Sequence, residues 1–120
     1  MADWFTGIDP GLTGGIVHLN SQGNIVFTAR MPRVKNQVDA LALAEILKEA
    51  NPRAVVVERV HAIRGAGAGS TFRFGESYGY ARGIPAGLGL RVIDATPYSW
   101  QKQMHRDIPG DDPKDRSRFA

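Results

Sequence analysis

The sequence contains no cysteine, so disulfides and thiolate metal sites are excluded and a reducing compartment is compatible with the chain. Its apolar runs are interrupted and no longer than a strand, so none could span a membrane. The N-terminus lacks the basic-then-apolar pattern of a secretory signal. These absences predict a cytoplasmic protein without a membrane partner.

The composition is that of a small folded protein. With 120 residues and 42% hydrophobic content, the chain can bury one modest core, and we expect residues 1–120 to form a single domain. The formal net charge of +3 permits a polyanionic partner such as nucleic acid but does not demonstrate one.

Hydrophobic patterning predicts strands that alternate with helices in the second half of the chain. Short strands separated by Gly- and Asn-rich turns come first, which is typical of an antiparallel meander. The expected strands are 3–8, 15–19, 25–31, 54–58 and 90–93, and the expected helices are 37–50, 70–84 and one that opens at 96–97. This order predicts an α/β fold with a mixed five-stranded sheet, in which β-α crossovers follow the meander and helices cover both faces.

The expected helix at 70–84 has an unusual composition. Ser70 can cap it, and Pro85 is expected to close it. Gly75, Gly79 and Gly83 recur every four residues, which lowers helix propensity at each position. A glycine stripe of this kind predicts a flat face that can lie close against a neighbour.

Asp9 lies where the first strand ends, directly before the turn Pro10-Gly11. A carboxylate at this point projects from the edge of the sheet, and the glycines after it leave room for a metal ion or a phosphate. Asp-Pro-Gly is also a common turn sequence, so this motif alone favours a structural role.

Glu58 occupies the same kind of position, directly after the buried run at 54–57. If the two strands are neighbours, Asp9 and Glu58 converge at one edge of the sheet, where hard oxygen ligands suit Mg²⁺ or Mn²⁺. The alternative is a surface ion pair between Glu58 and Arg59 or Arg64.

These residues resemble the RuvC-type Holliday junction resolvases, bacterial or phage enzymes of the ribonuclease H-like superfamily. The opening 7–11, followed by Gly14-Gly15, is similar to their first motif, and 56–60 is similar to their second. The segment 79–83 resembles the Gly-x-Ala-Arg-Gly of their central helix. Two later segments are also similar, one at 96–102 and one that contains Lys114 and Ser117. The order of the motifs along nearly the whole chain makes the resemblance fairly specific.

The resemblance implies a homodimeric, Mg²⁺- or Mn²⁺-dependent endonuclease that nicks branched DNA such as four-way junctions by hydrolysis, without a small-molecule cofactor. Its catalytic residues would be Asp9 and Glu58 as metal ligands, with Lys102 and Lys114 near the scissile phosphate. Both lysines could equally be solvated surface charges. The residues that would contact DNA are His61, Arg64, Phe72, Arg73, Gln101, Lys102 and Lys114. His61 could equally be a neutral loop residue, and at least one of Phe72 and Phe74 is expected in the core.

The sequence departs from the family at its end. The resolvases complete their site with aspartates on a C-terminal helix, and the chain stops at Ala120 before such a motif. This predicts a shortened chain or fragment with weak metal affinity and poor turnover. Three alternatives stay open: another ribonuclease H-like nuclease of the RuvX/YqgF type that processes RNA, a catalytically incomplete DNA-binding module, and a sugar-kinase-like ATPase, for which the chain is far too short.

Overall fold

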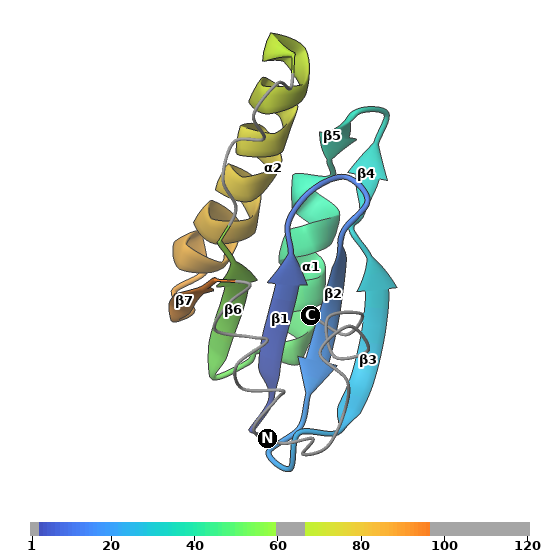
Figure 1. Ribbon diagram of the computed structural model, residues 1–120. Coiled ribbons are helices and arrows are strands. Elements are labelled where there is room, and N and C mark those ends of the chain that lie inside the picture. The colour runs from blue at the N-terminus through green and yellow to red at the C-terminus, as the bar shows by residue number, and fades with distance from the viewer. Residues whose placement is uncertain (1–2, 60–66, 97–120) are drawn as a thin grey trace, which may run out of the picture.

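The computed structural model describes residues 3–59 and 67–96 of the chain, which form strands and two helices (Figure 1). The elements in chain order are β1 (Phe5–Asp9), β2 (Gly15–Leu19), β3 (Ile25–Arg30), β4 (Arg33–Val34), β5 (Gln37–Val38), α1 (Ala40–Ala50), β6 (Ala54–Glu58), α2 (Ala68–Gly87) and β7 (Val92–Ala95). No helix in the described part of the chain is both long and apolar enough to cross a membrane.

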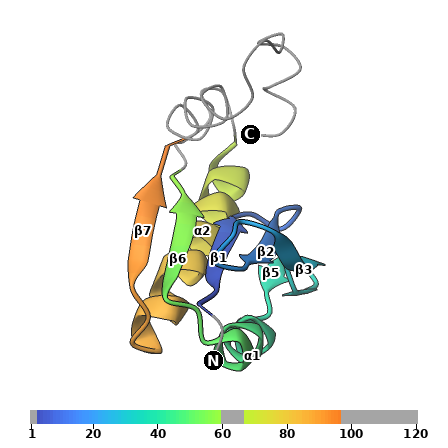
Figure 2. The ribbon, with the colours of Figure 1, turned by 90° about the horizontal axis from the view of Figure 1, so that it is seen from below.

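Five of the strands form one mixed sheet in the order β3-β2-β1-β6-β7, and this order can be followed from right to left in both ribbon views (Figures 1 and 2). β1 pairs with β2 and β2 with β3 in antiparallel orientation, whereas β1–β6 and β6–β7 are parallel. The β2–β3 turn is fixed by the Asn20 side chain, which accepts hydrogen bonds from the backbone of Gln22 and Asn24. The predicted α/β class and the mixed five-stranded sheet are confirmed.

The core lies between one face of the sheet and the helices. Alternate residues of β1, β2 and β6 are buried, as the two-residue period of a strand requires. Leu43 and Leu47 of α1 and Ala81 of α2 are fully buried in the same cluster. Because α1 and α2 also contact each other, both described helices cover the same face. The helix predicted to open at 96–97 lies outside the described residues, so two-sided coverage of the sheet stays a prediction.

Helix α1 begins three residues later than the sequence predicted. The Asp39 carboxylate caps it by accepting from the Ala42 N–H at 3.1 Å, and Asn51 ends it in the left-handed conformation. The missing first turn is instead the second strand of the β4–β5 ribbon, which reverses at Lys35 with φ of 57°. Two-residue strands are too short to show a hydrophobic period, which explains the error.

Helix α2 is longer than predicted at both ends. Gly67 occupies the N-cap position, so Ser70 lies in the first turn and is not the cap. Pro85 lies inside the last turn, and the helix continues because the Leu88 N–H bonds to the Ile84 carbonyl at 3.1 Å. The prediction that Pro85 closes the helix was therefore wrong.

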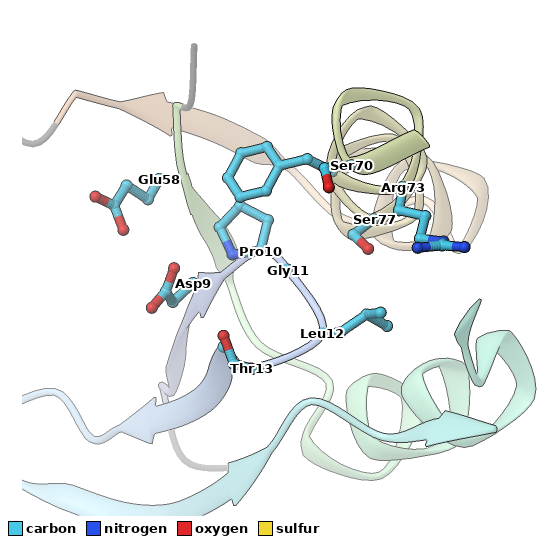
Figure 3. Close-up of a pocket in the computed structure, with 11 residues that line it drawn as sticks. Asp9, Pro10, Gly11, Leu12, Thr13, Glu58, Ser70, Arg73 and Ser77 are labelled. Atoms are coloured by element: carbon cyan, nitrogen blue, oxygen red, sulfur yellow. The ribbon is translucent and has the colours of Figure 1, made fainter. Parts of the chain in front are cut away.

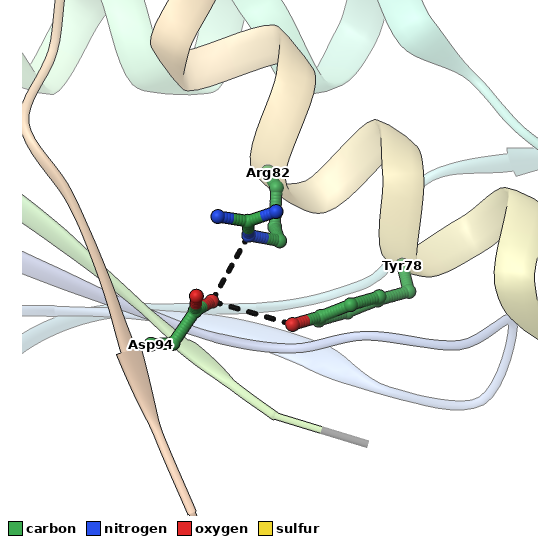
Figure 4. Close-up of polar contacts among 3 residues, drawn as sticks. All are labelled: Tyr78, Arg82 and Asp94. Carbon is green, nitrogen blue, oxygen red and sulfur yellow. Dashed lines mark hydrogen bonds and ion pairs between the residues drawn. The ribbon is translucent and has the colours of Figure 1, made fainter. Parts of the chain in front are cut away.

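Strand β7 is attached to α2 through Asp94 (Figure 4). Asp94 Oδ1 accepts from Arg82 Nε at 3.0 Å and from Tyr78 Oη at 3.3 Å. The strand runs two residues beyond its predicted end, and Asp94 occupies a position on the helix-covered face. These contacts hold β7 and α2 in a fixed relation at the side of the sheet next to β6.

Candidate metal centre and phosphate cleft

The turn after β1 depends on two glycines. Gly11 adopts a φ of 118°, a conformation that side chains disfavour, and the Gly14 N–H bonds to the Gly11 carbonyl at 3.1 Å. A Cβ on Gly14 would lie only 1.9 Å from the backbone oxygen of Asp9. The turn therefore requires glycine at both positions.

Glu58 lies beside Asp9 because β6 runs parallel to β1. The register pairs Ile8 with Val57, so the next residue of each strand is Asp9 and Glu58 respectively. Figure 3 shows both carboxylates at the same edge of the sheet. The structure thus brings together the two carboxylates that the sequence expected to converge.

The proximity of the two carboxylates shifts the pKa of Glu58. Burial, followed by the negative charge of Asp9 and a side-chain hydrogen bond with it, raises the pKa of Glu58 above its ordinary value. Two carboxylates in this arrangement repel each other when both are ionised. A divalent cation between them would relieve that repulsion.

The carboxylates form one side of an open cleft of about 430 Å³. The turn after β1 forms its floor, and the first half of α2 forms the opposite wall (Figure 3). The α2 side chains that line it are Ser70, Arg73, Phe74 and Ser77. A cleft with carboxylates on one wall and a guanidinium on the other suits a ligand that carries both a metal ion and further negative charge.

The predicted DNA contacts divide into three groups. Arg73 lines the cleft, and its contact with DNA stays a prediction. Phe72 is 69% exposed on α2 and does not line the cleft, so a stacking role there stays a prediction. Phe74, expected in the core as an alternative, is half-buried, and a Cβ added to Gly11 would lie 3.8 Å from its ring. The remaining residues lie outside the described part of the chain: His61, Arg64, Gln101, Lys102 and Lys114.

Sequence reasoning missed Ser77. It is only 3% exposed, although it is a polar residue on a helix rich in glycine. Ser77, Ala81 and Pro85 are the three buried residues of α2, and their spacing of four residues is a detectable helical period. That period could have indicated a serine facing the sheet.

The donor set fits a hard divalent cation, although it is sparse. Within residues 3–59 and 67–96, no group of three or more His, Cys, Asp or Glu side chains converges. Mg²⁺ is commonly held by one or two carboxylates together with water and substrate phosphates, and the pair Asp9 and Glu58 meets that requirement. Oxygen-only ligands also suit Mn²⁺.

No protein-family model matches the chain, and no curated protein matches it. Solved structures of similar fold include the RuvC of Thermus thermophilus in complex with a Holliday junction substrate (TM-score 0.70, 17% identity, 84% of this chain and 69% of that one). A second Thermus thermophilus RuvC structure is 22% identical with a TM-score of 0.54, over 94% of this chain and 74% of that one. The yeast mitochondrial Holliday junction resolvase Ydc2 is 13% identical with a TM-score of 0.61, over 89% of this chain and 56% of that one.

These likenesses define the fold. The chain has the α/β architecture of the ribonuclease H-like proteins. Within that class it is similar to the RuvC-like Holliday junction resolvases of a bacterium and of yeast mitochondria.

Proposed function

We propose that the chain is a Mg²⁺- or Mn²⁺-dependent endonuclease that nicks four-way junctions and related branched DNA by phosphodiester hydrolysis. The observation that carries this proposal is the convergence of Asp9 and Glu58 at the carboxyl ends of two adjacent parallel strands, beside a cleft with a cationic far wall. The similarity in fold to junction resolvases supports DNA as the substrate.

Asp9 and Glu58 would hold the cation through their carboxylate oxygens. When bound, a divalent cation lowers the pKa of a coordinated water and stabilises charge on the reacting phosphate. The Asp9 side chain is exposed and that of Glu58 is partly exposed, so a cation can reach both carboxylates from solvent. The chain's own contribution is to fix the two carboxylates and to align a DNA strand along the cleft.

Arg73 would hold the strand from the α2 wall. A guanidinium presents several N–H donors and matches the geometry of phosphate oxygens. Lys102, Lys114, Gln101, His61 and Arg64 would extend this contact surface, and a homodimer would match the two-fold symmetry of a four-way junction. These assignments rest on the sequence resemblance.

Nicking of an end-labelled junction in Mn²⁺, Mg²⁺, Ca²⁺ and EDTA tests the proposal. Products with 5′-phosphate ends are expected in Mn²⁺ or Mg²⁺ and not in EDTA. Asp9→Asn and Glu58→Gln should reduce the nicking rate by at least about 100-fold, since each removes one of two charged ligands. Glu45→Gln is the matched control, because Glu45 is an exposed carboxylate on α1 outside the cleft.

The same experiment identifies a binding module without activity. Such a module would bind the junction in preference to linear duplex in all four proteins and nick it in none. Cleavage of an RNA hairpin in preference to the junction would instead favour the RNA-processing alternative.

A further inference from the structure

The α2 wall of the cleft carries three donors that the metal centre does not use. They are the hydroxyls of Ser70 and Ser77 and the guanidinium of Arg73, spaced by three and four residues on one side of the helix. Figure 3 shows them across the turn after β1 from Asp9 and Glu58. They therefore face the same cleft from the side opposite the carboxylates.

Ser77 is a buried hydroxyl without a partner. Its side chain is 3% exposed and lines the cleft, and no atom of the described residues forms a hydrogen bond with its Oγ. Buried hydroxyls in folded proteins are nearly always hydrogen-bonded, because an unpaired one has lost its water without compensation. An unpaired donor aimed into a cleft points to a ligand that supplies the acceptor.

Arg73 supplies positive charge that is not neutralised within the described part of the chain. The described ion pairs join Arg53 to Asp3 and Arg82 to Asp94, and none involves Arg73. Its guanidinium is one helical turn from Ser77, on the same wall of the cleft. A guanidinium and an unpaired hydroxyl on the same wall suit an anion with several acceptor oxygens, such as phosphate.

The start of α2 adds a third favourable feature. The first hydrogen bond within the helix joins the Thr71 N–H to the Gly67 carbonyl at 3.0 Å. The N–H groups of residues 68–70 come before it and have no carbonyl partner within the helix. Gly67 has no side chain that could cap these groups. Ser70, the last residue of this uncapped first turn, lines the cleft, so N–H groups without a helix partner lie next to the proposed donors.

We propose that Ser70, Arg73, Ser77 and the first turn of α2 form a phosphate-binding subsite. It holds a phosphate of the substrate strand that neighbours the scissile one, and so aligns the strand between α2 and the carboxylates. The identity of the ligand as DNA rests on the proposed function, whereas the preference for phosphate rests on the donors themselves.

The first test is an NMR titration of the chain with inorganic phosphate in the absence of metal. We expect saturable amide shifts at 68–70 and at Ser77, with affinity reduced at least tenfold in Arg73→Gln and severalfold in Ser77→Ala. Ser77→Ala should keep the thermal midpoint of the native chain, because it removes an unpaired hydroxyl. Arg91→Gln, the same charge change at the amino end of β7, should bind phosphate normally.

Absence of these shifts would overturn the subsite, and so would equal affinity in Arg73→Gln and the native chain. Because the titration uses neither metal nor junction, its result is independent of the nuclease proposal. A chain that binds phosphate at α2 but never nicks a junction keeps the subsite and loses the nuclease.

The second test places the subsite on the substrate. Single neutral methylphosphonates are introduced on either side of the cleaved bond, and junction binding is measured in Ca²⁺. A methylphosphonate at one of these positions should weaken junction binding by the native chain about tenfold and leave binding by Arg73→Gln unchanged. Equal losses in both proteins at every position would contradict the assignment.

Discussion

Replacing Glu58 by Gln should stabilise the metal-free protein while it removes a metal ligand. In EDTA no cation lies between the carboxylates, and burial followed by the negative charge of Asp9 raises the pKa of Glu58. Two unit charges about 4 Å apart repel by about 1 kcal/mol in water and more at lower dielectric. We use the lower value because Asp9 is exposed and solvent screens the pair. A gain of about 1 kcal/mol corresponds to a rise in Tm of about 4–8 °C for a domain of roughly this size.

The pH dependence of this gain has a definite sign. A carboxyl whose pKa is raised in the folded state contributes stability below its unfolded pKa and loses it as pH rises through the folded value. The advantage of Glu58→Gln should therefore be present at pH 8 and vanish below the ordinary glutamate pKa of 4.5, where the native carboxyl is protonated.

Thermal unfolding followed by circular dichroism measures both effects. Mn²⁺ should raise the Tm of the native chain, because it binds only the folded state, and should raise that of Glu58→Gln much less. Glu45→Gln controls for the loss of a carboxylate elsewhere and should show neither effect. A lower Tm for Glu58→Gln at pH 8 in EDTA, or an equal response of both proteins to Mn²⁺, would refute this reasoning.

Four further predictions concern the scaffold. Gly14→Ala should destabilise the fold by at least about 2 kcal/mol in urea unfolding, because its Cβ would collide with the Asp9 backbone oxygen. Gly79→Ala meets no atom within 4 Å and should stabilise the monomer by up to about 1 kcal/mol through helix propensity; a loss of stability instead would reveal a neighbour on this face. Burial lowers the pKa of His18, so the urea midpoint should fall as pH drops below the ordinary histidine pKa of 6.5. A flat profile from pH 7.5 to 5.5 would contradict this. Asp94→Asn should cost about 0.5–1 kcal/mol, measured in the same assay, because it weakens a half-exposed ion pair; no change would show that the contact to α2 contributes nothing.

The strands that border the site could be predicted from the sequence almost residue by residue. A continuous β-branched run such as the one that ends at Glu58 is typical of a strand buried on both faces. Gly15 marks the start of β2 after the turn. Asp9 and Glu58 converge because β1 and β6 are neighbours in the sheet. The sequence pattern is compatible with this pairing but does not determine it. The parallel register then determined their proximity.

The α2 wall of the cleft could not be predicted in the same way. A glycine-rich start and Pro85 both indicate helix ends, yet the helix spans 20 residues. Which side chains face the cleft depends on the rotation of α2 against the sheet. That Ser77 is buried and lines the cleft follows only from this rotation.

The most direct test of the central claim compares the initial nicking rate of a four-way junction with that of a linear duplex of the same sequence, in Mn²⁺, for the native chain and for Asp9→Asn. We expect the native chain to nick the junction far faster than the duplex, and Asp9→Asn to nick neither. Equal rates on the two substrates, or an undiminished rate in Asp9→Asn, would contradict this expectation.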